Sequence, residues 1–144
     1  MMNMEEGIKK RILSVKDTVK IKVRVDDTDL MSVVHFKNYL SFFDMGFVEF
    51  MSAIENPVES AVQSGIVFPV KKIEITYEES AKFGDYITVE TKIKEIGEKS
   101  ITFLHKIFRE SDNALLADVE CVRLVMELKS KKLLNVAKFL TKYV

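Results

Sequence analysis

The sequence has few of the residues that disulfide-stabilised, metal-binding or fibrous proteins need. Its 144 residues include one cysteine, two histidines, two prolines, five glycines and no tryptophan. The lone Cys121 cannot form an intrachain disulfide and lies in an apolar segment, so we expect a buried core thiol. Two histidines and one cysteine cannot build a zinc motif of the usual spacing, and we expect neither a metal nor an organic cofactor.

Neither sign of charge is in excess, because Lys plus Arg and Asp plus Glu number 22 each. The net charge therefore offers no general attraction for a nucleic-acid backbone or an anionic membrane surface. No segment approaches the roughly 20 apolar residues of a membrane span, and the N-terminus carries two early glutamates in place of a secretory signal. We expect a soluble, cytoplasmic protein that binds no nucleic acid and does not insert into membranes.

The composition is that of a folded globular protein, with 47% apolar and 31% charged residues. The length suits one domain over residues 1–144. Residues 18–25 alternate strictly, which predicts a half-buried strand. Its apolar face is Val19, Ile21, Val23 and Val25.

Residues 39–54 are apolar on nearly every side, which predicts a long helix enclosed by other structure. A short helix over 57–64 follows, and then four strands over 66–79, 86–96, 100–109 and 114–128. Short turn-rich breaks separate these strands and favour antiparallel hairpins. Asn135 is placed to cap a last helix over 136–143. This order predicts an α+β fold in which a curved antiparallel sheet of about five strands wraps around one long helix.

The candidate reactive side chains lie in the stretch Asp26, Asp27, Thr28 and Asp29, which joins the first strand to the segment before the long helix. Reactive groups are often carried by loops that rigid elements hold in place. Clustered carboxylates also serve in turns and helix caps, so this structural alternative stays open. His105 shares its face of a strand with apolar residues, and we expect a core or interface histidine there.

These residues also resemble a known family. Val-Arg-Val-Asp-Asp-Thr-Asp at 23–29, Val-Val-His-Phe at 33–36, Asn38-Tyr39 and the aromatic helix to residue 51 are similar to the signature of the 4-hydroxybenzoyl-CoA thioesterase family. Residues 65–70, 72–79 and 84–85 resemble the family's second strand and first hairpin, so the likeness covers about 19–128. It implies the hotdog fold and an acyl-CoA thioesterase without a cofactor.

The resemblance assigns roles to three residues. It implies that Asp29 is catalytic, that the backbone N–H of Phe36 forms the oxyanion hole, and that His35 assists. A helix N-terminus suits the negative charge that develops on a thioester oxygen. A carboxylate opposite it can act as general base or attack the carbonyl itself, and the sequence leaves both routes open.

The resemblance also suggests how acyl-CoA binds. Candidates for an apolar acyl slot are Phe43, Phe47, Phe68 and Pro69, and candidates for the nucleotide end are Lys99 and Ser100. An exposed edge strand predicts a homodimer or homotetramer, with the active site at a subunit interface. Residues 30–32, Leu-Met-Ser, stand where the family has glycines. Two alternatives are a non-catalytic acyl-CoA-binding module and a dehydratase of 3-hydroxyacyl thioesters.

Overall fold

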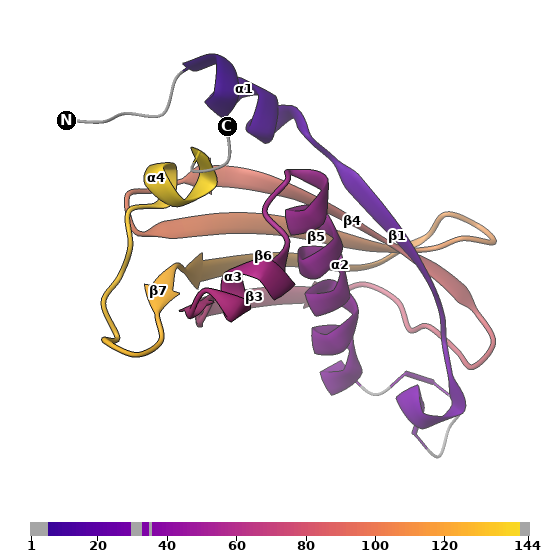
Figure 1. Cartoon of the computed structure of the whole chain (residues 1–144). Helices are drawn as coiled ribbons and strands as arrows, with labels where there is room; N and C mark the ends of the chain where they lie inside the picture. The colour runs from indigo at the N-terminus through magenta and orange to yellow at the C-terminus, as the bar shows by residue number, and fades with distance from the viewer. Residues whose placement is uncertain (1–5, 30–32, 35, 142–144) are drawn as a thin grey trace.

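The computed structural model describes residues 6–29, 33–34 and 36–141 (Figure 1). Along these residues it has four α-helices, two short 3-10 helices and seven strands. Their order is α1 (Glu6–Ser14), β1 (Asp17–Lys22), η1 (Val25–Asp27), η2 (Phe36–Asn38), α2 (Tyr39–Ala53), α3 (Val58–Gln63), β2 (Ile66–Val67), β3 (Val70–Tyr77), β4 (Tyr86–Ile96), β5 (Ser100–Arg109), β6 (Leu115–Leu124), β7 (Met126–Glu127) and α4 (Val136–Thr141).

Five strands form one antiparallel sheet in the order β1-β4-β5-β6-β3, and β2 pairs with β7 beside it. Figure 1 shows α2 lying across one face of this curved sheet, so the α+β architecture is confirmed. The predicted hairpin between residues 66–79 and 86–96 is wrong. β1 occupies the place beside β4, with Ile21 opposite Ile87, and β3 pairs with β6 at the far edge.

The long helix is present, but the prediction that other structure encloses it on nearly all sides is wrong for the protomer. One face packs on the sheet through Phe42, Phe43, Gly46, Phe47, Phe50 and Met51. The opposite face is open, and Leu40 keeps 43% of its surface exposed. At Gly46 the backbone comes so near the sheet that a Cβ atom would lie 2.7 Å from side-chain atoms of Val89 and Thr91.

The core divides into two clusters along α2. At the aromatic end, Phe47 and Phe50 each contact Phe103 edge to face, and Phe47 makes a similar contact with Phe68. Helices α1 and α4 close this end with the buried side chains of Ile12, Val136, Phe139 and Leu140. At the Asp29 end, the first turns of α2 pack against Val23, Val34, Ala81, Ile87 and Ile107.

Several local predictions are confirmed. The strands over 86–96 and 100–109, the short helix α3 and the buried Cys121 are as expected. The cap of α4 is also present, because the Lys138 N–H donates to Asn135 Oδ1 at 3.0 Å. Residues 142–144 lie outside the described part.

Other local predictions are wrong. Strand β1 ends at Lys22, and Val25 opens the 3-10 turn η1 with 66% of its surface exposed. Pro69 has no N–H for a ladder, so the strand expected over 66–79 divides into β2 and β3. The strand expected over 114–128 likewise divides into β6 and β7. Helix α1 is short and rich in lysine and arginine, and the sequence did not predict it.

Candidate active site

The loop after β1 is held at both ends by hydrogen bonds. The Val23 N–H donates to the Asp85 carbonyl at 2.8 Å, which ties the end of β1 to the start of β4. The chain then makes the turn η1, which the Thr28 hydroxyl closes by donating to the Val25 carbonyl at 2.6 Å. Such a loop keeps its polar side chains in fixed positions on a rigid sheet.

Two carboxylates of this loop, those of Asp26 and Asp27, interact with Arg24 in different ways. The Arg24 N–H donates to Asp27 Oδ2 at 2.8 Å, which is the capping role that the structural alternative expects. Asp26 lies 3.5 Å from the Arg24 Nε, and both side chains are mostly exposed. Capping and surface pairing therefore account for Asp26 and Asp27. Asp29 is half-buried and follows η1.

Asp29 lies on a narrow turn that leads toward α2. Its N–H donates to the Val33 carbonyl at 2.9 Å, and Thr28 and Val34 form an antiparallel bridge. The Val34 N–H donates in turn to the Ala81 carbonyl at 2.8 Å, which fastens the turn to the chain between β3 and β4. Residues 30–32 and His35 lie outside the described residues, so the assisting role of His35 stays a prediction.

The entrance to α2 is fastened to the same loop. Phe36 opens η2, and η2 continues directly into α2 at Tyr39. The Asn38 side-chain amide donates to the Asp27 carbonyl at 2.7 Å, so the acidic loop and the helix entrance are joined. The first N–H groups of a helical segment have no acceptor within it and carry the positive end of the helix dipole. The backbone N–H of Phe36 belongs to this first turn.

A cleft of about 260 Å³ lies beside this entrance, lined by Val34, Tyr39, Tyr77 and residues 78–80. The rings of Tyr39 and Tyr77 meet edge to face with centroids 5.4 Å apart. The Tyr39 hydroxyl accepts a hydrogen bond from the Ala81 N–H at 3.0 Å. Burial raises the pKa of Tyr39 above its ordinary value of 10.0. The cleft is therefore lined by two aromatic side chains together with Glu78 and Glu79.

The residues expected to bind substrate divide between the core and the far end of the sheet. Phe43, Phe47 and Phe68 are buried side chains of the protomer core. Pro69 is half-buried, and Lys99 and Ser100 lie at the turn between β4 and β5. β4 leads from the Asp29 end to this turn. Its eleven residues span about 35 Å at roughly 3.3 Å per residue. In one protomer, Lys99 and Ser100 therefore do not meet Asp29.

The core holds polar side chains as well. His105 is fully buried, as expected, and its Nδ1 lies 2.8 Å from the Thr91 hydroxyl oxygen. Burial, and next the positive charge of Arg123, lower the pKa of His105 to about 3, so its ring is neutral at pH 7. Arg123 donates to Asp44 Oδ1 at 2.8 Å and lies 3.9 Å from the centre of the Phe47 ring.

Sequence reasoning missed the pair Asp44 and Arg123 and the placement of Tyr77. The signals were present. Asp44 is an acid in an otherwise apolar stretch of helix. Arg123 lies two residues after Cys121 in β6, so strand alternation directs both side chains toward α2. Strand alternation also places Tyr77 on the same face as Ile73 and Ile75.

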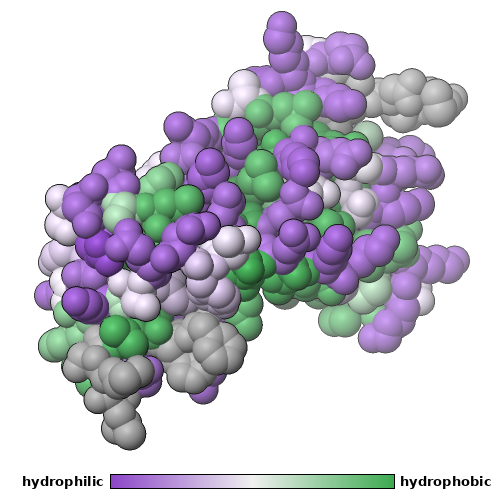
Figure 2. Space-filling view, turned by 180° about the vertical axis from the view of Figure 1, so that it is seen from behind, coloured by the Kyte–Doolittle hydropathy of each residue, from purple (hydrophilic) through white to green (hydrophobic). Residues whose placement is uncertain are grey.

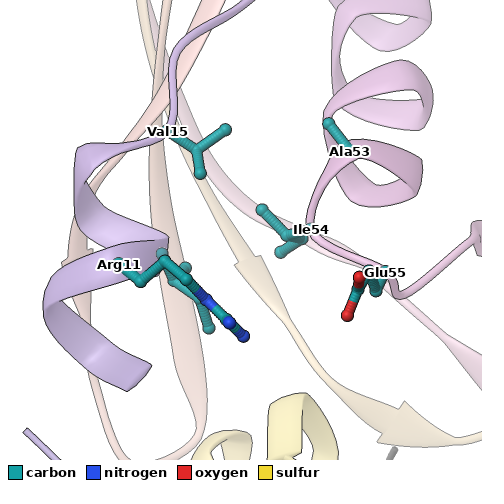
Figure 3. Close-up of a pocket in the computed structure, with 6 residues that line it drawn as sticks. Arg11, Val15, Ala53, Ile54 and Glu55 are labelled. Atoms are coloured by element: carbon teal, nitrogen blue, oxygen red, sulfur yellow. The ribbon is translucent and has the colours of Figure 1, made fainter. Parts of the chain in front are cut away.

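A second hollow, of about 190 Å³, lies at the other end of α2 (Figure 3). Arg11 and Val15 of α1 and its following turn face Ala53, Ile54 and Glu55 across it, and Ile12 also lines it. This end of the helix is the one opposite to Phe36, so the hollow is separate from the Asp29 loop.

Within the described residues, no helix is long and apolar enough to cross a membrane.

Known proteins are similar to this chain in sequence or in fold. The acyl-CoA thioesterase YbgC of Haemophilus influenzae is 28% identical over 92 residues, which cover 63% of this chain and 68% of that protein. The hypothetical protein TT1821 of Thermus thermophilus superposes with a TM-score of 0.79 at 25% identity, over 90% of this chain and 98% of that one. The DHNA-CoA thioesterase of Staphylococcus aureus superposes with a TM-score of 0.83 at 18% identity, over 89% and 85%, which shows the fold alone. The model of the thioesterase-like superfamily matches residues 23–142. The chain therefore has the hotdog fold and belongs to the thioesterase-like superfamily.

Proposed function

We propose that this protein is an acyl-CoA thioesterase, which hydrolyses an acyl-CoA thioester to the free acid and coenzyme A. Membership of the thioesterase-like superfamily supports the hydrolysis, since most of the chain matches that family. The substrate class is supported by relatives that are named acyl-CoA thioesterases, YbgC of Haemophilus influenzae among them.

Within this function, Asp29 is the catalytic carboxylate. The assignment rests on the different structural roles of the acidic residues in this loop. Asp27 caps a turn, and Asp26 pairs with Arg24 on the surface. Asp29 alone of the three lies on the turn that leads to the entrance of α2. A half-buried carboxylate near a helix entrance is suited to act on a carbonyl whose oxygen faces that entrance.

Two routes fit this placement. As a general base, Asp29 takes a proton from water, the water oxygen attacks the thioester carbon, and the carbon–sulfur bond then breaks to release coenzyme A. As a nucleophile, Asp29 attacks the thioester carbon, and the carbon–sulfur bond breaks to release coenzyme A as a thiolate that takes up a proton. Water then hydrolyses the mixed anhydride to the free acid and restores the Asp29 carboxylate. In both routes the backbone N–H of Phe36 donates to the oxygen that becomes negative.

The site is proposed to form between subunits of a homodimer or homotetramer. Phe68 and Pro69 would then contact the acyl group, and Lys99 and Ser100 the nucleotide end of coenzyme A, from the end of the sheet opposite to Asp29. Phe43 and Phe47 border the same interior from α2. Residues 1–144 act as one domain in this proposal.

The test is Asp29→Asn, which removes the charge and keeps the volume of the side chain. A positioned base contributes about 10²- to 10⁴-fold, so kcat for thiol release from a panel of acyl-CoA esters should fall by that factor with KM little changed. Asp26→Asn and Asp27→Asn are the matched controls and should hydrolyse within about threefold of the parent.

Other outcomes would contradict the proposal. Hydrolysis by Asp29→Asn within about threefold of the parent is too small a change for a lost base, and Asp29 would then be structural. Tight binding of every ester by the parent without thiol release would indicate a binding module. Addition or loss of water at the 2,3-carbons would indicate a dehydratase.

A further inference from the structure

The segment between β3 and β4, residues 78–85, contacts two parts of the Asp29 end of the molecule. The Ala81 carbonyl accepts the Val34 N–H at 2.8 Å, at the turn that carries Asp29. The Ala81 N–H donates to the Tyr39 hydroxyl at 3.0 Å, in the first turn of α2. One residue of this segment therefore holds the turn of the carboxylate and the helix entrance at a fixed spacing.

The same segment fixes the start of the acidic loop. The Asp85 carbonyl accepts the Val23 N–H at 2.8 Å, and Lys82 forms an antiparallel bridge with Val33. Residues 78–80 line the cleft beside the helix entrance. A shift of this segment would therefore move the acidic loop, the helix entrance and one wall of the cleft relative to one another.

Residues 78–85 form neither a helix nor a strand, so their position depends on contacts with other elements. The Arg109 side chain makes two such contacts, one near each end of the segment. Its Nη2 donates to the Ser80 carbonyl at 2.9 Å, and its Nε lies 3.4 Å from Asp85 Oδ2. The same Asp85 oxygen accepts the Lys82 N–H at 2.9 Å, which closes the turn before β4. One side chain therefore holds both ends of the segment.

Arg109 occupies a position that otherwise suits an apolar residue. It is the last residue of β5 and lies opposite Ile87 of β4, which is fully buried. Figure 2 shows many hydrophilic side chains at the surface of this end of the molecule, on the left of the view, yet the Arg109 side chain is only 16% exposed. A guanidinium is costly to bury unless it has acceptors, and its planar fork can donate to several at once. Its contacts with Ser80 and Asp85 therefore account for its burial.

We propose that Arg109 is a positioning residue of the thioesterase site, an inference that rests on the proposed function. Arg109 acts through residues 78–85, in which Ala81 holds both the Asp29 turn and the helix entrance. The thioester carbonyl must meet the carboxylate and the Phe36 N–H together, so a small change in their spacing lowers the rate.

A third contact of Arg109 defines the structural alternative. Its Nη1 donates to Asp112 Oδ2 at 2.8 Å, in the turn between β5 and β6, and the Ala114 N–H donates to Asp112 Oδ1 at 3.1 Å. If Arg109 served this turn alone, the loss of Asp112 and the loss of Arg109 would have the same effect. Asp112→Asn is therefore the matched control, because it removes the charge and keeps an acceptor for Ala114.

Amide hydrogen exchange tests the positioning without substrate. Arg109→Met keeps an unbranched stem and removes the donors, so the Val34 and Ala81 amides should exchange at least about tenfold faster than in the parent. In Asp112→Asn both amides should stay within about threefold of the parent. The Phe103 amide in the core is the reference, since a general loss of stability would accelerate its exchange as well.

Steady-state kinetics with the best acyl-CoA ester tests the consequence for catalysis. A displacement of about 1 Å can cost about 10²-fold, so kcat of Arg109→Met should fall by about 10- to 100-fold with KM within about threefold. Asp112→Asn should keep kcat within about threefold of the parent. Arg109→Lys keeps the charge and loses the planar fork, so its kcat should stay at least about fivefold below the parent.

The proposal is overturned by unchanged exchange at Val34 and Ala81 in Arg109→Met, or by an unchanged kcat in that variant. It is also overturned by equal losses of kcat in Asp112→Asn and Arg109→Met, or by full recovery in Arg109→Lys. An Asp29→Asn variant as active as the parent would instead contradict the assignment of Asp29. Because the exchange measurement needs no substrate, the two failures are distinguishable.

Discussion

At the aromatic end of the molecule, α2 packs Phe47 and Phe50 against Phe103, and helices α1 and α4 close the core over them. At the Asp29 end, the first turn of the same helix places Tyr39 beside an open cleft, and hydrogen bonds between loops hold the chain. Both ends therefore bury apolar side chains, and the Asp29 end also holds polar groups in position beside an open cleft. The first anchors the helix that the second requires.

The largest expected loss of stability comes from Phe47→Ala at the aromatic end. The substitution leaves a cavity beside Phe68 and Phe103 and removes the ring beneath Arg123, which would cost about 3 to 5 kcal/mol. The measurement is the free energy of unfolding from urea titration.

Leu40→Ala is the matched control for this substitution, because Leu40 is on the exposed face of the same helix. It should change the free energy of unfolding by less than about 1 kcal/mol. A loss below about 1 kcal/mol for Phe47→Ala as well would mean that the two faces of α2 do not differ as described.

His105 connects the two ends, because its ring stacks on Phe43 at 5.3 Å and on Phe103 at 6.1 Å. Its pKa is about 3 in the folded protein against 6.5 as the ordinary value, so between these pH values the unfolded chain binds a proton that the folded chain does not. Stability from this residue is present above about pH 6.5 and is lost as the pH falls toward 3. From pH 7 to pH 5 the loss should be about 2 kcal/mol.

The variant His105→Gln isolates this contribution, since glutamine does not titrate. Its unfolding free energy should fall by about 2 kcal/mol less than that of the parent between pH 7 and pH 5. Equal acid losses in the two proteins would show that His105 is not held neutral.

The smallest expected effect concerns the cap of α4, which helps to close the aromatic end. Asn135→Ala removes the acceptor of the Lys138 N–H and should cost about 1 kcal/mol. Asn135→Asp keeps an acceptor oxygen and should restore most of that loss. Thermal unfolding that is the same for all three proteins would mean that α4 contributes little to this closure.

Local patterns in the sequence predicted most of the elements and failed on how they pair. Alternation predicted the strands over residues 86–96 and 100–109, and apolar residues predicted the helix over 39–54. These patterns suffice because each depends only on residues that are close in sequence. The place of β3 was not predictable in this way. A short turn before Tyr86 suggests a hairpin, and only the long-range pairing of β1 with β4 excludes it.

The candidate site was predictable to a similar extent. The loop of Asp29 and its connection to α2 follow from the order of the elements, whereas the roles that separate Asp27 from Asp29 depend on hydrogen bonds with Arg24 and Val33. The location of Lys99 at the opposite end of the sheet required the topology. Its proposed contribution requires a second chain.

The close packing of α2 on the sheet at Gly46 means that a substitution there would affect the helix beyond its own position. Because a Cβ there would lie 2.7 Å from atoms of Val89 and Thr91, any larger residue must lift the middle of α2 from the sheet by several tenths of an ångström. Those two side chains are buried and β-branched, so they cannot easily turn aside. A helix moves as a nearly rigid rod, and the displacement would be carried to the turn at Phe36. Natural or engineered diversity at Gly46 should therefore be limited by the alignment of the helix entrance as well as by packing.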